Sequence, residues 1–174
     1  QTPLLPFFFL LSAILMGFGV TMLESLLSSV AFKRPFETPI LSRLSVFMAW
    51  VTVVYLGVRL ADLLFRGAPI FTSGSQSVSF FVENLLFLVP VLLLVNPAWQ
   101  NDLRWLFVAA SSMILAGALY RFNAFLIGYD PGVGWRYFPA TQELLITIGI
   151  VAFELMAYLY FVKRYPVLPQ VEHA

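Results

Sequence analysis

Five long apolar stretches constrain what this chain can fold into more than any other feature. A helix that crosses a bilayer needs about 20 mainly apolar residues, and such stretches run over about 4–32, 42–65, 77–95, 103–127 and 140–162. Charged residues make up 11% of the chain, whereas a soluble domain has about a quarter. We therefore expect an all-α integral membrane protein of about five transmembrane helices, with residues 1–165 as its transmembrane domain and 166–174 as a tail.

The breaks between the stretches carry residues that end helices. Pro35 and Pro39 separate the first two stretches, and Asn96-Pro97 closes the third. Proline lacks a backbone N–H and its ring clashes with the preceding turn, so it interrupts a helix. The second helix is therefore expected to begin only after Pro39, and Pro90 stands out as an internal proline of the third.

The placement of lysine and arginine predicts the orientation in the membrane, because these residues concentrate in cytoplasmic loops. The face that holds Arg66 and Arg136 has fewer basic residues than the other face. We therefore predict that the N-terminus lies outside and the C-terminus in the cytoplasm. The basic residues assigned to the cytoplasmic face are Lys33, Arg34, Arg43, Arg104, Lys163 and Arg164.

Several charged residues fall within the apolar stretches. A charge at the bilayer centre costs at least about 2.5 kcal/mol, so each one needs a partner or a purpose. Arg59 and Asp62 are three residues apart and can pair on one helix face. Glu83 and Arg121 lie at similar depths below the outer ends of their helices and could meet across the bundle. The full set is Glu24, Arg59, Asp62, Glu83, Arg121, Glu143 and Glu154.

The depths of the carboxyls allow a second interpretation, a proton path. By the rise of a helix, Glu83, Glu154 and Glu24 lie roughly 9, 21 and 30 Å from the outer side. With Asp62, they are our candidates for carrying protons through the bundle. The alternative is structural: Glu83 neutralises Arg121, Asp62 neutralises Arg59, and the other carboxyls stay protonated or bond across helices. No catalytic residue is predicted.

Small residues in the first stretch recur at a spacing of four, which predicts a face where another helix approaches closely. Glu24 follows Gly17 by seven residues, so we expect it to share this face and point inward. The small residues are Ala13, Gly17, Thr21, Ser25 and Ser29.

Missing residue types exclude several kinds of chemistry. The chain has no cysteine, which removes disulfides and thiolate ligation of iron–sulfur clusters. Its one histidine, His173, lies in the tail. A membrane haem b needs axial ligands inside the bundle, normally histidines, so we expect no haem. No metal-binding or nucleotide-binding motif is present, and a net charge of +1 gives no reason to expect nucleic acid.

The C-terminal part of the chain carries a resemblance to a known family. The segment from Tyr120 to Pro169 is similar to the C-terminal part of HybB, the membrane (b-type cytochrome) subunit of periplasm-facing Ni/Fe hydrogenases, within the NrfD/polysulfide-reductase membrane family. The features that carry the resemblance are Arg121-Phe122-Asn123, Gly134-Trp135-Arg136-Tyr137-Phe138-Pro139, Glu143 and Lys163-Arg164-Tyr165-Pro166.

This resemblance implies a fold and a setting. The chain would be the second half of a ten-helix protein, its first four helices forming the second four-helix bundle and its fifth a flanking helix. Gln1 is not an initiator residue, which agrees with a portion of a longer protein. The family would sit in the bacterial inner (cytoplasmic) membrane and carry no haem despite its name.

The resemblance also implies partners. Electrons would pass between a quinone in the membrane, menaquinone or ubiquinone, and an iron–sulfur subunit on the outer face, next to the hydrogenase large and small subunits. The quinone site would lie mostly in the other half, and coupled proton translocation is an open alternative. The outer loop is the candidate for docking the iron–sulfur subunit, or else a cap at the membrane surface; its residues are Tyr129, Trp135, Arg136 and Tyr137.

Two other classes stay open from the residues alone. Half of a secondary transporter would also carry charges inside the membrane, but such transporters favour helices interrupted at matching positions. A purely structural membrane anchor is the third reading. In an anchor, carboxyl-to-amide changes would affect stability without affecting turnover.

Overall fold

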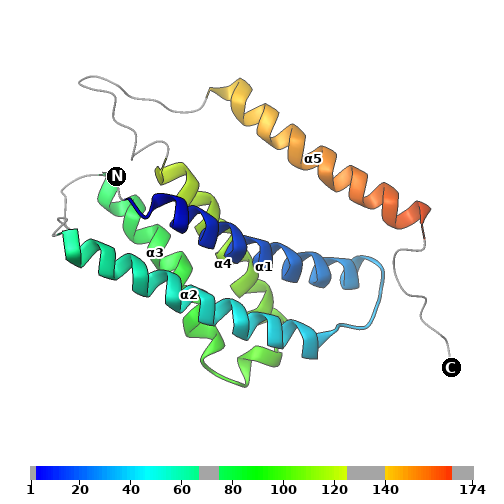
Figure 1. The fold of residues 1–174 in the computed structure, drawn as a ribbon. Helices are drawn as coiled ribbons and strands as arrows, with labels where there is room; N and C mark the ends of the chain where they lie inside the picture. Colours follow the sequence, from blue (N-terminus) through cyan, green and yellow to red (C-terminus); the bar gives the residue numbers. More distant parts are fainter. Residues whose placement is uncertain (1–2, 67–74, 125–139, 166–174) are drawn as a thin grey trace. The chain divides into compact units, whose positions relative to one another are not determined.

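The computed structural model describes residues 3–66, 75–124 and 140–165, and the secondary structure of these residues is helical (Figure 1). The chain divides into two compact units, Gln1–Asp130 and Pro131–Ala174. The first contains α1 (Leu5–Ala31), α2 (Thr38–Arg66), α3 (Ser75–Leu94), a short 3-10 helix η1 (Trp99–Asn101) and α4 (Leu103–Phe122); the second contains α5 (Thr141–Arg164).

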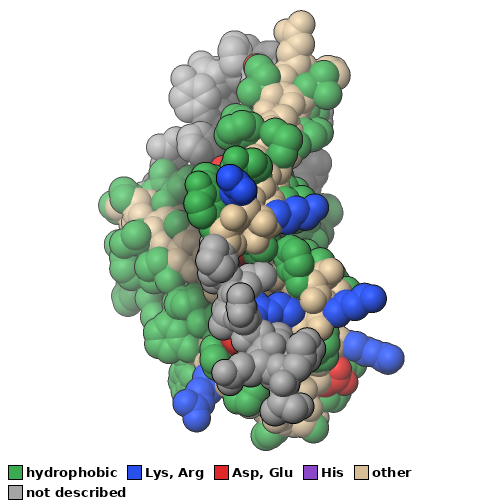
Figure 2. Space-filling view, turned by 90° about the vertical axis from the view of Figure 1, so that its right-hand side faces the viewer, with side chains coloured by type: hydrophobic (Ala, Val, Ile, Leu, Met, Phe, Trp, Pro, Cys, Tyr) green, Lys and Arg blue, Asp and Glu red, His purple; other side chains and the backbone are tan. Residues whose placement is uncertain are grey.

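The expectation of an all-α integral membrane protein is confirmed. Within the described residues, α1, α2, α4 and α5 are long and apolar enough to span a membrane, and α3 contributes a shorter apolar helix over Val78–Leu94. Figure 2 shows one face of the molecule, on which hydrophobic side chains predominate and Lys and Arg side chains project among them. Such a surface suits contact with lipid along the helices.

Two helix boundaries differ from those expected from the sequence. The second helix begins at Thr38, four residues earlier than Ser42. Pro39 therefore lies in the first turn of α2, where the N–H that proline lacks would have had no partner in any case. The α-helix of α4 ends at Phe122, and the predicted end near Ile127 lies outside the described residues.

The four helices of the first unit form a closed ring in which α1 contacts α2, α2 contacts α3, α3 contacts α4 and α4 returns to α1. Their shared core is apolar and aromatic. The large side chains buried in it are Leu15, Met22, Met48, Tyr55, Phe87, Leu106 and Met113.

The close approach of α1 and α4 depends on two glycines. A Cβ atom placed on Gly19 would lie 3.1 Å from the carbonyl oxygen of Ala110, and one on Gly117 would lie 3.2 Å from Cβ of Met16. Neither position has room for a side chain. The two backbones can therefore approach as small residues allow in membrane helix pairs.

The small-residue face predicted for α1 is wrong in part. Ser29 is buried, but Ala13, Gly17 and Thr21 are exposed in the first unit, and so is Glu24, which was expected to point inward. Each step of four residues rotates about 40° around a helix, so five such residues drift over roughly 160° and cannot share one narrow face.

The internal proline of α3 is compensated by a serine of α4. Pro90 is fully buried and lacks the N–H that would bond the Leu86 carbonyl one turn earlier. Ser112 of α4 donates its hydroxyl to that carbonyl oxygen at 2.8 Å. The bond satisfies a backbone group that lipid could not, so α3 continues through the proline.

Replacing Ser112 by Ala should destabilise the protein, because the Leu86 carbonyl would be left buried without a donor. The expected loss is about 1–3 kcal/mol, measured as a lower midpoint of thermal unfolding in detergent, followed by circular dichroism. Ser111→Ala removes the same group from the neighbouring position and is the matched control. Equal effects of the two variants would contradict this role for Ser112.

Candidate functional site

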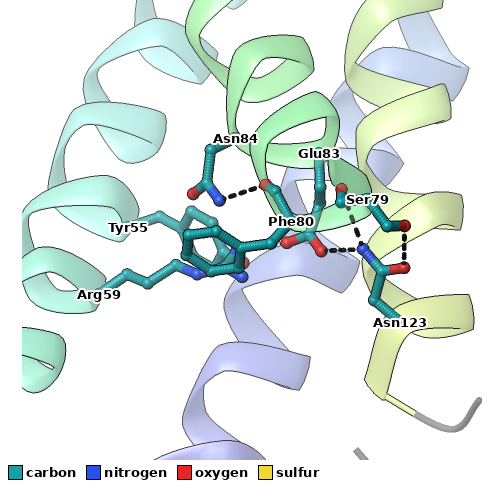
Figure 3. A network of polar contacts seen from close by, with 7 residues as sticks. All are labelled: Tyr55, Arg59, Ser79, Phe80, Glu83, Asn84 and Asn123. Carbon is teal, nitrogen blue, oxygen red and sulfur yellow. Dashed lines mark hydrogen bonds and ion pairs between the residues drawn. The ribbon is translucent and has the colours of Figure 1, made fainter. Parts of the chain in front are cut away.

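A buried polar network joins α2, α3 and the end of α4 (Figure 3). Arg59 of α2 forms an ion pair with one carboxylate oxygen of Glu83 on α3. Asn123, the residue that follows α4, donates its side-chain N–H to the other carboxylate oxygen at 2.6 Å. The side chains of Arg59 and Glu83 are only 13% and 1% exposed, so the charges are sealed inside the first unit.

Helical spacing places the supporting residues. Tyr55 precedes Arg59 by one turn of α2, and its hydroxyl accepts a hydrogen bond of 3.0 Å from the Arg59 guanidinium. Ser79 precedes Glu83 by one turn of α3, and its hydroxyl donates to the carbonyl oxygen of the Asn123 side chain at 2.6 Å. This bond orients the amide, because it leaves the N–H side of Asn123 facing Glu83.

Three aromatic rings surround the Arg59 guanidinium. Its Cζ atom lies 4.9 Å from the ring centroid of Phe80, 5.4 Å from that of Tyr120 and 5.8 Å from that of Tyr55. Aromatic rings at such distances attract a cation, and more strongly where water is excluded. Phe87 packs against Tyr55 with ring centroids 4.7 Å apart, which extends the aromatic packing into the core.

Both carboxylate oxygens of Glu83 face donors, Arg59 on one side and Asn123 on the other. Removing one member of a buried ion pair costs about 3–5 kcal/mol, because the other charge stays buried without compensation. The network therefore holds α2, α3 and the end of α4 together.

The predicted pairing of Glu83 with Arg121 is wrong, since Glu83 pairs with Arg59. The guanidinium of Arg121 instead donates to the sulfur of Met16 at 2.9 Å and to the carbonyl oxygen of Gly117 at 3.2 Å. The reason is rotation along α4. Arg121 lies about 100° around the helix from Tyr120, whose ring faces Arg59, and so it points toward α1.

The other predicted carboxyls differ in burial and in the unit to which they belong. Asp62 is buried on α2, whereas Glu24 is exposed on the side of α1 opposite the one that packs in the ring. Glu143 and Glu154 belong to α5 in the second unit. Glu143 accepts a hydrogen bond of 3.3 Å from the backbone N–H of Ala140, which makes it a capping residue at the start of α5.

The predicted docking residues of the outer loop cannot be placed. They lie outside the described residues, and they are Tyr129, Trp135, Arg136 and Tyr137.

Sequence reasoning missed the residues that complete the network. Ser79 and Tyr120 drew no attention, and Asn123 entered only as part of a family motif. One signal was available: an amide inside an apolar stretch needs a hydrogen-bond partner as much as a charge does. Tyr120 remains unusual, because its buried hydroxyl has no hydrogen-bond partner among the described residues.

A ring of apolar helices sealed around an ion pair defines a polytopic membrane protein. The comparison with known proteins is more specific. The chain is 34% identical over 173 residues to a protein of Escherichia coli (strain K12) named "Probable Ni/Fe-hydrogenase 2 b-type cytochrome subunit". The match covers 97% of this chain and 44% of the relative, so the chain spans less than half the length of the curated protein it matches. No protein-family model matches the chain, and no solved structure matches it significantly.

The similarity to the hydrogenase subunit thus extends well beyond the segment from Tyr120 to Pro169. The assignment to the wider NrfD family and the position in the C-terminal half of a longer protein stay predictions.

The expectation of no haem is contradicted, because the relative's name, b-type cytochrome subunit, denotes haem b. The absence of haem was inferred from the lack of axial ligands in these 174 residues, whereas the relative is more than twice as long. The described residues themselves do not fit such a group. They include no histidine or cysteine, and no cluster of His, Cys, Asp and Glu among them could hold a metal ion.

Replacing Glu83 by Gln should destabilise the first unit by about 3–5 kcal/mol, since Arg59 would keep a buried charge without its counter-ion. The double variant Arg59→Met/Glu83→Gln removes both charges and should recover much of that loss. Thermal unfolding in detergent measures both. Glu154→Gln, on α5, is the control and should change little.

Strictly additive effects of the Arg59 and Glu83 changes would contradict the coupling of these two side chains.

Proposed function

We propose that this chain serves in a membrane subunit of a respiratory nickel–iron hydrogenase complex. The observation that carries the proposal is the 34% identity to the E. coli hydrogenase 2 subunit, which extends over 97% of the chain. The all-helical fold and its apolar spanning helices support a membrane role. We place the protein in the bacterial inner membrane, with the N-terminus outside and the C-terminus in the cytoplasm.

In this role the subunit anchors an iron–sulfur electron-transfer subunit and the hydrogenase large and small subunits at the outer face. Electrons from hydrogen then pass to the quinone pool, or return from it. We assign docking of the iron–sulfur subunit to the outer loop, because it is aromatic and lies on the same side as Arg66 in the predicted topology. Its residues are Tyr129, Trp135, Arg136 and Tyr137.

The buried network contributes rigidity to this function. Arg59, Glu83 and Asn123 tie three helices at one level of the first unit. A subunit that holds an electron-transfer partner at a constant distance from a membrane quinone needs such a scaffold. The same network supports a second candidate, a purely structural anchor, because none of its members has a described reactive role.

Gentle solubilisation of the tagged chain from its native membranes should recover a nickel–iron hydrogenase pair together with an iron–sulfur subunit. Mass spectrometry identifies the subunits, and electron paramagnetic resonance identifies the iron–sulfur centres. The membranes should also reduce quinone when given hydrogen. Recovery of the chain as a lone homodimer would overturn the proposal.

A paired change tests the docking loop in the same preparation. Trp135→Ala/Tyr137→Ala should release the iron–sulfur subunit, because it removes two of the aromatic rings of the loop. Tyr165→Ala, at the predicted cytoplasmic end of α5, is the matched control and should retain that subunit.

Proton movement is a separate proposal for three further carboxyls, Glu24, Asp62 and Glu154. Replacing Glu154 or Glu24 by Gln should abolish proton translocation in vesicles supplied with hydrogen and quinone while assembly of the complex is intact. A pH-sensitive dye reports proton uptake, and quinone absorbance reports turnover. Normal proton movement in both variants would remove these residues from any path and favour the anchor.

A further inference from the structure

The hydroxyl of Tyr120 is a buried polar group that the network around Arg59 and Glu83 leaves unused. Only 6% of Tyr120 is exposed. Its hydroxyl is the single buried side-chain nitrogen or oxygen of the described residues that forms no hydrogen bond. A hydroxyl that leaves water without gaining a hydrogen bond destabilises a fold. Its burial therefore points to a partner other than a described side chain.

Packing fixes the ring that carries this hydroxyl. The centroid of the Tyr120 ring lies 5.2 Å from that of Phe9 on α1 and 6.2 Å from that of Tyr55 on α2, and the Tyr55 ring stands at 84° to it. The Cζ atom of Arg59 lies 5.4 Å from the same centroid. Contacts from two other helices thus hold the hydroxyl inside the first unit.

Two side chains next to Tyr120 also have hydrogens that the network does not use. A guanidinium carries five N–H groups, and both hydrogen bonds that Arg59 donates among the described residues come from its Nη1 atom. The hydrogens on Nε and Nη2 therefore have no acceptor among these residues. Tyr55 is fully buried, and its hydroxyl accepts one of the Arg59 bonds while its own hydrogen remains available.

A water molecule suits polar groups that lie near one another without bonding directly. Buried waters typically form about three hydrogen bonds to polar groups that lack other partners, whereas apolar cavities stay dry. The surroundings of the Tyr120 hydroxyl are polar in this sense, because Arg59, Glu83 and Arg121 all act on it electrostatically. The hydroxyls of Tyr120 and Tyr55 and the guanidinium of Arg59 supply the three partners.

Charge and packing argue against other occupants. A metal cation would be repelled by the guanidinium of Arg59, and an anion would compete with Glu83 for the same guanidinium. A flat organic molecule would need a ring face on which to stack. Arg59 already lies over the rings of Phe80 (Figure 3), Tyr120 and Tyr55, so such a molecule would have to displace it.

We propose that Tyr120, Arg59 and Tyr55 bind one water molecule inside the first unit. The water accepts hydrogen bonds from the Tyr120 hydroxyl and from an N–H group of Arg59 that the network does not use, and the Tyr55 hydroxyl is its third partner. It links α4 directly to α2, two helices that stand across the ring from each other. The site is independent of the hydrogenase assignment, because it uses only side chains of the first unit.

Tyr120→Phe tests the site, because it removes the hydroxyl and keeps the ring that packs against Phe9 and Arg59. A hydroxyl bound to water has a hydrogen bond to lose, so the midpoint of thermal unfolding should fall. A hydroxyl without any partner would give the opposite sign, since its removal relieves the cost of burying it. Circular dichroism of the full chain in detergent measures the midpoint. Tyr160→Phe removes the same group from an exposed position on α5 and should leave the midpoint unchanged.

A density map shows the occupant itself. Electron cryo-microscopy of the protein, in the assembly in which it is purified from its native membranes and at a resolution that reveals ordered waters, should show an isolated peak. The peak should lie within about 3.2 Å of both the Tyr120 hydroxyl oxygen and a guanidinium nitrogen of Arg59.

Three results would overturn the proposal. A midpoint for Tyr120→Phe equal to or above that of the unchanged protein would show that the hydroxyl has no bond to lose. A map without a peak beside the hydroxyl would exclude an ordered water there. Density that continues into a side chain, a lipid or another organic molecule would identify a different occupant.

Discussion

The ion pair between Arg59 and Glu83 is the interaction on which the rest of the first unit depends. Two charges inside a membrane protein are tolerable only if each satisfies the other, and here Asn123 and the aromatic rings around Arg59 complete the arrangement. Because the three polar residues come from α2, α3 and the end of α4, the pair fixes the relative height of these elements. An apolar core in lipid cannot set that register by hydrophobicity alone, since lipid tails are as apolar as the core.

The sequence predicted the helices well because hydrophobic length is a local property. Bilayer thickness demands long apolar runs, and the chain contains them with little ambiguity. Pro39 shows the limit of this reasoning, since proline ends a helix at one position and begins it at another. Pro90 shows a second limit: α3 continues through it because Ser112 of another helix bonds the Leu86 carbonyl, a contact that no local pattern reveals.

The polar site was harder to predict because charge pairing is a long-range property. Arg59, Glu83 and Arg121 could all be recognised as membrane-embedded charges, but the choice of partner depends on how α3 and α4 rotate about their axes. Glu24 was placed on the wrong side of α1 for a similar reason, because a spacing of four drifts around a helix. The expectation of no haem failed for a different reason. It used only the residue types that this chain lacks, whereas the relative is more than twice as long.

The aromatic and ionic packing at the centre of the first unit also limits where ions can travel. At the level of Glu83 the interior is filled by Tyr55, Phe87 and the guanidinium of Arg59, all held by neighbours on several helices. At this level the ion pair, whose two charges cancel, and the aromatic rings fill the centre of the four-helix ring. A proton that crosses the membrane with the help of this chain would therefore have to pass around this filled level of the ring.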